Sequence, residues 1–544
     1  MIKLNKVDIN SVVNNLSEEE LILGYKDKLI KGVNYLCDMI KVTLGAKGKT
    51  VLYRNKHDKP AITKDGVTVA RHCSSDDSAE QMAIDIVREA SEKTVKTSGD
   101  GTTTTAVLAQ YLVNRGFELM QNSNISYYDL SKGMDIALEA VCNKIREMSL
   151  DVDSNFDKLL DVATVSANSK EIGQFVFDII KEIGAYGSIE IKKSNHTKDR
   201  IDVVKGVKFN KGFYAPHFVS DLNRMRWVAT NVFIVLLDDT IRSMNDLYPY
   251  LRAANNSPIL FIINDIEPTV LQNLINAKLM AQSRANEEGY NFNIMLVEHD
   301  GFGDRKTEIM NDIGAMTGAT RATCELAGIM GWAEEVCVDA DTTSILGGSM
   351  NVELVEELVR ATKDKLDDVE GIYNLDDEDK LYYKRRLATL AGGVAVIHVG
   401  GTTEVEMNER RDRIEDAVEA VKAAIVRGIA VGGGYTFLKC HHLIYEELID
   451  KIDTKYEKGV ESVLESITEP FSQMCYNADI DYERQCKYAN SIVQDEGVLD
   501  LFSDDLVSLS DYKIYDPAGV LIDSLTNAVS VAKSILSIER VICY

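Results

Sequence analysis

A short polar segment, Gly99-Asp100-Gly101 followed by four threonines at 102–105, stands directly before an apolar helical pattern. Glycines let a backbone approach a ligand closely, and the free N–H groups and dipole of a helix N-terminus attract phosphate. An aspartate here would repel bare phosphate, whereas Mg²⁺ binds carboxylate and phosphate oxygens together. The segment therefore indicates a site for a nucleotide and its metal. An Asp or Thr that caps the helix in an ordinary polar loop is the alternative.

A second glycine turn, at residues 43–50, contains Gly48-Lys49-Thr50 and invites comparison with a phosphate-binding P-loop. It fails that template, because Thr43 stands where the first glycine is required and because the turn follows a predicted helix rather than a strand. The alternative that the backbone of this loop cradles a ligand in another way stays open.

The other chemistry-bearing residues indicate no second reaction. Taken alone, Asp65 and Asp416 are typical of surface or capping carboxylates, since Asp416 lies within a highly charged helical stretch. The histidines lack a second ligand pair at metal spacing, and no Gly-x-Ser-x-Gly motif is present. The 9 cysteines form an odd number without a Cys-x-x-Cys pair, which favours a reducing compartment.

Helical periodicity predicts the elements that would position these loops. The predicted helices cover residues 21–42, 79–96, 103–114, 408–426 and 435–448, and the predicted short strands cover 50–53 and 61–62. The middle of the chain differs, because the apolar runs 232–237, 259–263 and 292–297 alternate with helix-compatible segments. That alternation is typical of βαβ units with a buried parallel sheet. A charged, solvent-exposed helical hairpin is predicted over 354–390, and the glycines that follow it favour a hinge.

Composition limits the kinds of partner. The 544 residues allow three or four domains at about 150 residues each. The formal net charge of -26 disfavours nucleic acid and anionic membrane surfaces. The longest apolar runs fall far short of the roughly 20 residues of a membrane span, and residues 1–30 lack the apolar core of a secretory signal. We therefore expect a soluble, cytoplasmic protein.

In their order along the chain, these segments strongly resemble a group I chaperonin of the bacterial GroEL class. The resemblance covers nearly the whole chain, and it is carried by residues 42–48, 62–70, 99–104, 166–169, 301–305, 390–397, 404–407, 415–417 and 432–434. It implies a multidomain α+β chaperonin fold. A helical equatorial ATPase domain would comprise 1–147 and 427–544, a small intermediate hinge domain 148–205 and 394–426, and an α/β apical substrate-binding domain 206–393.

By motif position, the resemblance implies a site for ATP and Mg²⁺, with K⁺ as a further candidate ion. Asp100 matches the magnesium-coordinating aspartate of the family, and Asp516 matches the aspartate that contacts the nucleoside. Asp416 matches the aspartate that positions the attacking water, and Asp65 is assigned to catalysis with it. The remaining nucleotide-binding positions are Thr43, Leu44, Gly45, Lys64, Gly101, Thr102, Thr103, Thr104 and Gly433.

The resemblance also implies an apical groove that binds non-native polypeptides. The matching positions, mostly apolar or aromatic, are Phe213, His217, Phe218, Tyr248, Leu251, Leu271, Ile275 and Asn276. Without the family, Leu251, Leu271 and Ile275 would be interpreted as core positions of amphipathic helices. His217 and Asn276 make this groove more polar than is usual in the family.

Several features depart from the family pattern. The flexible tail rich in Gly and Met is missing, and no Asn-Ala-Ala stretch that would flank adenine occurs between Asp495 and Tyr515. Ala46 and Asp151 replace prolines of the family. A lineage far from typical bacterial chaperonins, such as a viral one, would explain these differences.

The function implied is ATP-driven folding of non-native polypeptides inside a ring of identical subunits. The ring would be heptameric, single or stacked in pairs, with a co-chaperonin as a candidate partner, in the cytoplasm or in the host cytoplasm for a virus. ATP binding would close Asp416 over the pocket at hinges near Gly206, Gly393 and Gly428. The alternative is a chaperonin-like ring scaffold that sequesters particular partners with little or no ATP-driven folding. Asp65, Asp100 and Asp416 favour the first.

Overall fold

The structure is a computed structural model that divides into two compact units. The first combines Met1–Phe177 with Arg413–Tyr544, and the second is Asp178–Asp412. The residues described are 18–54, 60–123, 125–152, 155–194, 196–221, 224–283, 292–299, 301, 303–323, 328–367, 377–449, 451–501 and 503–542. The boundaries fall inside α8 (Lys170–Ile183) and α14 (Glu404–Arg427), so that each of these helices belongs to both units.

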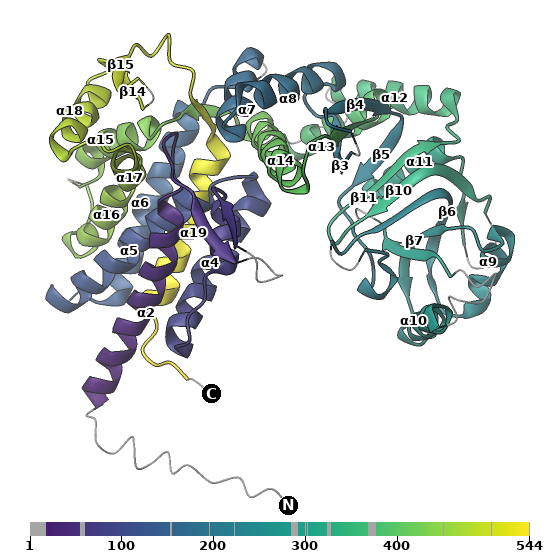
Figure 1. The fold of residues 1–544 in the computed structure, drawn as a ribbon, viewed down its shortest axis with the longest axis horizontal. Helices are drawn as coiled ribbons and strands as arrows, with labels where there is room; N and C mark the ends of the chain where they lie inside the picture. The colour runs from purple at the N-terminus through teal and green to yellow at the C-terminus, as the bar shows by residue number, and fades with distance from the viewer. Residues whose placement is uncertain are drawn as a thin grey trace, which may run out of the picture. The chain divides into compact units, whose positions relative to one another are not determined.

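Helices build the first unit (Figure 1). They are α2 (Glu18–Lys41), α3 (Gly66–His72), α4 (Ser78–Ser98), α5 (Thr102–Asn122), α6 (Tyr127–Met148), α7 (Leu159–Ala167), α15 (Tyr435–Ile449), α16 (Thr454–Ser466), α17 (Glu469–Asn477), α18 (Tyr482–Val493) and α19 (Ala518–Leu536). Local signals set their ends, as where the Asp77 carboxylate caps α4 by accepting from the N–H groups of Ala79 and Glu80. The helices predicted in this part of the chain are present with ends close to the expected ones, except that α5 continues to Asn122 instead of ending at 114.

The last helix, α19, is the central core element of the first unit. It packs against α4, α5 and α6, and Figure 1 shows it in yellow among them. Among the described residues, it is the one helix long and apolar enough to cross a membrane, but 78% of its apolar window is buried inside the protein. That burial is typical of a core helix. Its polar residues Asp523, Ser524 and Asn527 face other parts of the same unit.

Three antiparallel strand pairs complete the first unit. They are β1 (Val51–Arg54) with β2 (Pro60–Thr63), β13 (Ile429–Val431) with β16 (Tyr515–Pro517), and β14 (Val498–Asp500) with β15 (Asp505–Val507). In the second pair, Ala430 lies opposite Asp516. This register brings the glycine turn at 432–434 beside Asp516, although more than 80 residues separate them along the chain.

A seven-stranded sheet forms the larger part of the second unit, in the order β5-β11-β10-β6-β7-β8 with β9 beside β6. The strands are β5 (Gly206–Phe209), β6 (Trp227–Ile241), β7 (Ile259–Ile266), β8 (Ile294–Glu298), β9 (Arg321–Ala322), β10 (Gly331–Val338) and β11 (Thr343–Gly348). The β6–β7 and β7–β8 pairs are parallel, and α9 (Tyr248–Ala254) and α10 (Pro268–Ser283) connect them. The predicted βαβ units are therefore present, whereas β10, β11 and β5 pair antiparallel.

The rest of the second unit comprises a small sheet and three helices. Strand β12 (Val394–Val399) lies between β3 (Ser188–Lys193) and β4 (Arg200–Val204), and the helices are α11 (Asp304–Thr317), α12 (Val352–Asp367) and α13 (Asp377–Gly392). Helices α12 and α13 pack together as the predicted hairpin, and its residues 368–376 lie outside the described part. The predicted exposure holds for much of α12 but not for Arg386 of α13, whose largely buried side chain donates two hydrogen bonds, at 2.7 and 2.9 Å, to Asp312 of α11.

Candidate functional site

The polar segment 99–105 links α4 to α5. Gly99 ends α4 with a left-handed backbone (φ 76°), and its N–H donates to the carbonyl oxygen of Val95. Gly101 precedes the first turn of α5 with φ 102°, a conformation that favours glycine, and no described side chain caps that turn. The first N–H groups of α5 are thus left without the side-chain partner of an ordinary N-cap. The explanation of this segment as a simple cap is wrong.

Gly101 has no room for a side chain. A Cβ atom there would lie 2.5 Å from the Ser524 hydroxyl and 3.0 Å from side-chain carbons of Thr94 and Val520. Because alanine also resists a left-handed φ, we expect Gly101→Ala to lower the free energy of unfolding by about 1–3 kcal/mol, measured by urea denaturation. Gly184→Ala is the control, since Gly184 has φ 84° but its Cβ would meet nothing within 4 Å. A loss no larger than that of Gly184→Ala would contradict the role of packing.

A buried polar network lies behind the loop and fixes its position. The hydroxyl groups of Thr94 on α4 and Thr105 on α5 lie 3.1 Å apart, and the Asn527 amide donates to Thr94 at 2.8 Å. Ser524 donates to the carbonyl oxygen of Gly101 at 3.3 Å. Satisfied buried hydrogen bonds of this kind rigidify a structure. The loop is therefore held from α4, α5 and α19 at once.

Two further predicted loops approach the start of α5. The Thr43 and Thr103 hydroxyl oxygens lie 3.4 Å apart, and a Cβ atom at Gly66 would lie 2.6 Å from the Thr103 hydroxyl. Asp65 caps α3, accepting from two backbone N–H groups at 3.0 and 2.8 Å and from the Thr68 hydroxyl at 2.6 Å. The structure therefore brings Thr43, Asp65 and Thr103 together, and it also gives Asp65 the capping role that its sequence context indicated.

The other predicted positions of these loops differ in exposure. Thr102 is buried and Thr104 half-buried in the first turn of α5, whereas Lys64 is exposed. The Leu44 carbonyl oxygen accepts a side-chain amide of α17 at 2.9 Å. Gly45 has φ 82°, and a Cβ atom there would lie 2.7 Å from a Met474 side-chain carbon. The turn around Gly45 is thus held against α17.

Three carboxylates influence one another around the loop. Desolvation by the surrounding protein and, to a lesser degree, the charge of Asp65 raise the pKa of Asp100. Asp100 is nevertheless exposed to solvent. Burial and then the charge of Asp100 raise the pKa of Asp516 to about 7. Carboxylates from three distant parts of the chain therefore create a local excess of negative charge.

The residues present fit Mg²⁺ bound together with a nucleotide. Among the described residues, no group of three or more His, Cys, Asp or Glu side chains could hold a metal ion without other ligands. Mg²⁺ commonly binds one or two protein carboxylates and takes its other oxygens from phosphates and water. Asp100, adjacent to the uncapped start of α5, offers such a carboxylate where phosphate would bind.

The raised pKa of Asp516 predicts a pH dependence of stability. The unfolded chain should bind this proton only below the ordinary pKa of 3.8, whereas the folded protein keeps it up to about pH 7. The free energy of unfolding therefore decreases as pH rises through this window. In Asp516→Asn without nucleotide, we expect urea midpoints to decrease less between about pH 4 and 7 than in the wild type. Identical pH profiles would contradict the raised pKa.

The glycine turn after β13 brings Gly433 to the same region. The Gly432 N–H donates to the Ile514 carbonyl oxygen at 2.9 Å, and a Cβ atom at Gly432 would lie 2.9 Å from the Asp516 carboxyl carbon. Gly433 has φ 65°, so its backbone also adopts a conformation that favours glycine. Gly433, which follows Gly432 in this turn, therefore lies near Asp516.

Asp416 lies on the exposed side of α14 in the first unit. One turn further along α14, Glu419 packs against the loop so closely that a Cβ atom at Gly99 would lie 2.4 Å from the Glu419 Cβ. At the end of the helix, Arg427 forms an ion pair with Asp523 of α19 at 2.6 Å. Residues three apart share a helix face. Asp416 thus lies near the face of α14 that meets the segment 99–105.

The residues predicted to bind polypeptides, all in the second unit, differ in exposure. Phe218 and Ile275 are buried, and Phe213, Leu251 and Leu271 are half-buried, while the exposed ones are His217, Tyr248 and Asn276. The sequence interpretation missed Leu279 and Met280 of α10, whose exposed fractions are 52% and 64%. Their spacing from Ile275 and Asn276 is one helical turn, which is the signal that could have identified them.

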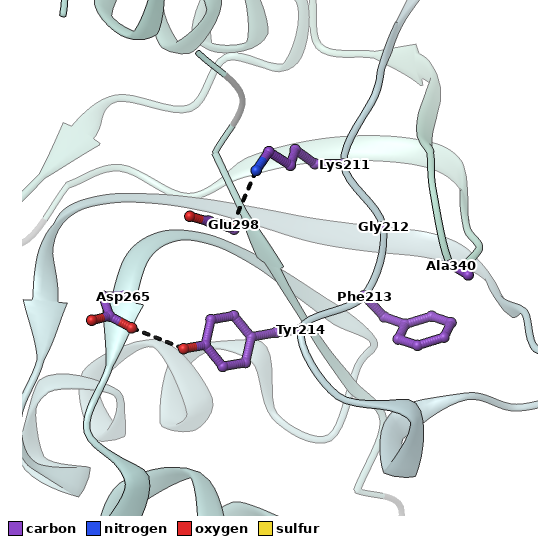
Figure 2. Close-up of a pocket in the computed structure, with 7 residues that line it drawn as sticks. All are labelled: Lys211, Gly212, Phe213, Tyr214, Asp265, Glu298 and Ala340. Atoms are coloured by element: carbon purple, nitrogen blue, oxygen red, sulfur yellow. Dashed lines mark hydrogen bonds and ion pairs between the residues drawn. The ribbon is translucent and has the colours of Figure 1, made fainter. Parts of the chain in front are cut away.

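A pocket of about 390 Å³ lies beside Phe213 in the second unit. Figure 2 shows the Tyr214 hydroxyl directed at Asp265, to which it donates at 2.8 Å, and Lys211 directed at Glu298, 3.1 Å away. The polar side chains that line this pocket therefore pair with one another. Phe213 and Tyr214 supply the aromatic side chains that line this pocket.

Comparison with known proteins agrees with this architecture. The model of the TCP-1/cpn60 chaperonin family matches residues 36–247 and 253–543. Two solved structures of the chaperonin gp146 from the bacteriophage EL 2 (Pseudomonas aeruginosa), both in the presence of ATP-BeFx, have a similar fold. Each is 21% identical and covers 94% of this chain and 97% of the phage chain, with TM-scores of 0.73 for crystal form II and 0.63 for crystal form I.

These matches confirm the predicted resemblance and the predicted chaperonin fold. The family model spans both compact units, so the identification does not rest on the phosphate loop alone. The chain belongs to the TCP-1/cpn60 chaperonin family.

Proposed function

We propose that this protein is an ATP-hydrolysing chaperonin subunit that captures non-native polypeptides and promotes their folding. The observation that carries the proposal is the uncapped start of α5 behind Gly101, with the Asp100 carboxylate beside it. The phage chaperonin structures determined in the presence of ATP-BeFx support nucleotide binding by this fold.

In this proposal, the chain binds the triphosphate with the first N–H groups of α5 and with the hydroxyl groups of Thr102, Thr103 and Thr104. Asp100 holds Mg²⁺, which would neutralise charge between the phosphate oxygens and the carboxylates. Phosphoryl transfer depends mainly on positioning and on stabilisation of charge, so a rigid loop suits it. The hydrogen bonds from Thr94 and Ser524 supply that rigidity.

Asp416 orients the attacking water in this scheme, and Asp65 assists from the opposite loop. Both carboxylates lie in the first unit, on α14 and at the start of α3. Helix α14 ends at Arg427, and the φ of 80° at Gly428 directly after it marks a turn that would act as a pivot. Because α14 belongs to both units, its movement would couple hydrolysis to the second unit, with Gly393 and Gly206 as the other proposed hinges.

The second unit would hold the polypeptide substrate on exposed apolar side chains of α9 and α10. We expect the double substitution Leu279→Ser and Met280→Ser to weaken binding of a denatured client by about tenfold, because it removes two exposed apolar side chains. Co-sedimentation with a urea-denatured client measures this. The control is Gln272→Ser with Asn273→Ser, which changes exposed polar positions of the same helix. Equal effects of the two pairs would contradict the assignment.

The domain organisation follows the family in this proposal. An equatorial domain of 1–147 and 427–544, an intermediate domain of 148–205 and 394–426 and an apical domain of 206–393 would form one subunit of a homo-oligomeric ring. The same proposal includes a heptameric ring, either single or double. It also includes a co-chaperonin lid and action in the cytoplasm of a host cell. Native mass spectrometry of the full chain would count the subunits.

Refolding of a denatured client, with and without ATP and with and without a co-chaperonin, tests the function directly. Recovery of client activity that requires ATP is the expected result. Suppressed aggregation without any recovery linked to ATP would contradict the proposal and would favour a sequestering scaffold instead.

A further inference from the structure

Tyr512 carries a buried hydroxyl group that nothing in the described structure satisfies. Its side chain is 4% exposed, and its hydroxyl has no hydrogen-bond partner among the described residues. The ring packs in an apolar cluster that includes Phe471 and Leu499. A buried polar group without a partner is destabilising, and phenylalanine would fill the same space without that penalty. The position of this hydroxyl group therefore needs an explanation other than packing.

The hydroxyl is directed at the glycine turn of the candidate site. A Cβ atom at Gly433 would lie only 2.2 Å from the Tyr512 hydroxyl oxygen. At the preceding residue of this turn, a Cβ atom at Gly432 would lie 2.9 Å from the Asp516 carboxyl carbon. Burial and then the charge of Asp516 raise the pKa of Tyr512, so the two groups share one electrostatic environment and the phenol stays protonated. The turn thus has a hydrogen-bond donor at Gly433 and a carboxylate acceptor at Gly432.

This pair of groups complements a vicinal diol. The Asp516 carboxyl group can accept a hydrogen bond whether it is ionised or protonated, and a phenol can donate one. A sugar with two neighbouring hydroxyl groups can donate to the first and accept from the second. We propose that the Tyr512 hydroxyl donates to a ribose hydroxyl of the bound nucleotide, beside Asp516, and makes the site selective for ribonucleotides. The inference rests on the proposed nucleotide site and adds a residue that the motifs did not identify.

Binding of ADP and of 2′,3′-dideoxy-ADP to the full chain, measured by calorimetry with Mg²⁺, tests the proposal. We expect Tyr512→Phe to weaken ADP binding by about tenfold and to leave dideoxy-ADP binding unchanged. Tyr435→Phe is the matched control, because Tyr435 lies in the same cluster and its hydroxyl donates to Asp495 at 3.0 Å. This control should alter neither affinity. Equal losses for the two nucleotides, or no loss for ADP, would overturn the ribose contact.

Thermal unfolding without nucleotide separates a binding role from a structural one. Tyr512→Phe should unfold at the same temperature as the wild type or a higher one, because it removes an unpaired buried hydroxyl, whereas Tyr435→Phe should unfold at a lower one. A decrease for Tyr512→Phe as large as that for Tyr435→Phe would overturn the inference. A wild-type protein that binds neither nucleotide would contradict the proposed function itself, whereas normal ADP binding by both Tyr512→Phe and the wild type would contradict only this contact.

Discussion

Replacing Asp416 with alanine should reduce ATP turnover by at least about a hundredfold while ATP binding stays unchanged. The proposed phosphate-binding groups lie on α5 and in the loops before it, whereas Asp416 lies on α14 and is exposed. Its removal leaves the buried network around Thr94 and Thr105 intact. A residue that acts on the attacking water contributes to the transition state and not to the affinity for ATP, so turnover and binding should separate.

Steady-state phosphate release and equilibrium binding of ATP, measured on the same preparation, provide the two readouts. Glu419→Gln is the matched control, since Glu419 lies one turn along the same helix face and forms an ion pair with Lys422 at 2.7 Å. The Cβ contact of this residue with the Gly99 turn remains in the glutamine variant. Unchanged turnover in Asp416→Ala, or an equal loss in Glu419→Gln, would remove Asp416 from the proposed catalytic role.

Local patterns in the sequence predicted many elements of this fold, but they did not delimit the helices α16 to α19. The apolar periodicity that identified α4, α5 and α14 and the runs that became β6, β7 and β8 are properties of neighbouring residues. Strands β10, β11 and β5 pair antiparallel with one another, and β5 joins β11 across more than 130 residues. Pairing at that separation depends on the tertiary fold. The exposure of α13 was misjudged for a similar reason, because the partner of Arg386 lies on α11.

The candidate site shows the same division between local and distant information. The segment 99–105 was recognisable from residue types alone, because glycine, aspartate and threonine before a helix indicate phosphate. Asp516 and Gly433 were identified as site residues only through the family resemblance. The β13–β16 pairing that brings them close together joins distant parts of the chain, so local sequence patterns do not predict it. No sequence pattern identified Tyr512 as a candidate binding residue. A buried tyrosine is ordinary, and only its unsatisfied hydroxyl beside Gly433 distinguishes it.

Several features of the site work against the stability of the empty protein. Asp100 and Asp516 repel each other, and the Tyr512 hydroxyl lies buried without a described partner. Binding sites often retain such locally unfavourable arrangements because a ligand relieves them. A nucleotide with Mg²⁺ would neutralise the carboxylates. Substitutions at these positions should therefore have opposite effects on stability and on binding.

Asp100→Asn provides the clearest case of these opposite effects. The pKa of Asp100 is raised, so its charged form is disfavoured in the folded state, and asparagine should increase the free energy of unfolding without nucleotide near neutral pH. Loss of the carboxylate should weaken Mg²⁺-dependent nucleotide binding by about a hundredfold. Urea denaturation and titration with ADP, with Mg²⁺ and with EDTA, measure the two effects. In EDTA the affinities of variant and wild type should converge.

Asp65→Ala supplies the contrast for stability, because Asp65 caps α3 through two backbone N–H groups and the Thr68 hydroxyl. Losing that cap should lower the free energy of unfolding by about 0.5–2 kcal/mol. Two neighbouring carboxylates of one site are thus expected to change the stability of the empty protein in opposite directions. A decrease in stability for Asp100→Asn, or an ADP affinity that no longer differs from the wild type when Mg²⁺ is present, would show that Asp100 is a structural group and not the ligand of the metal.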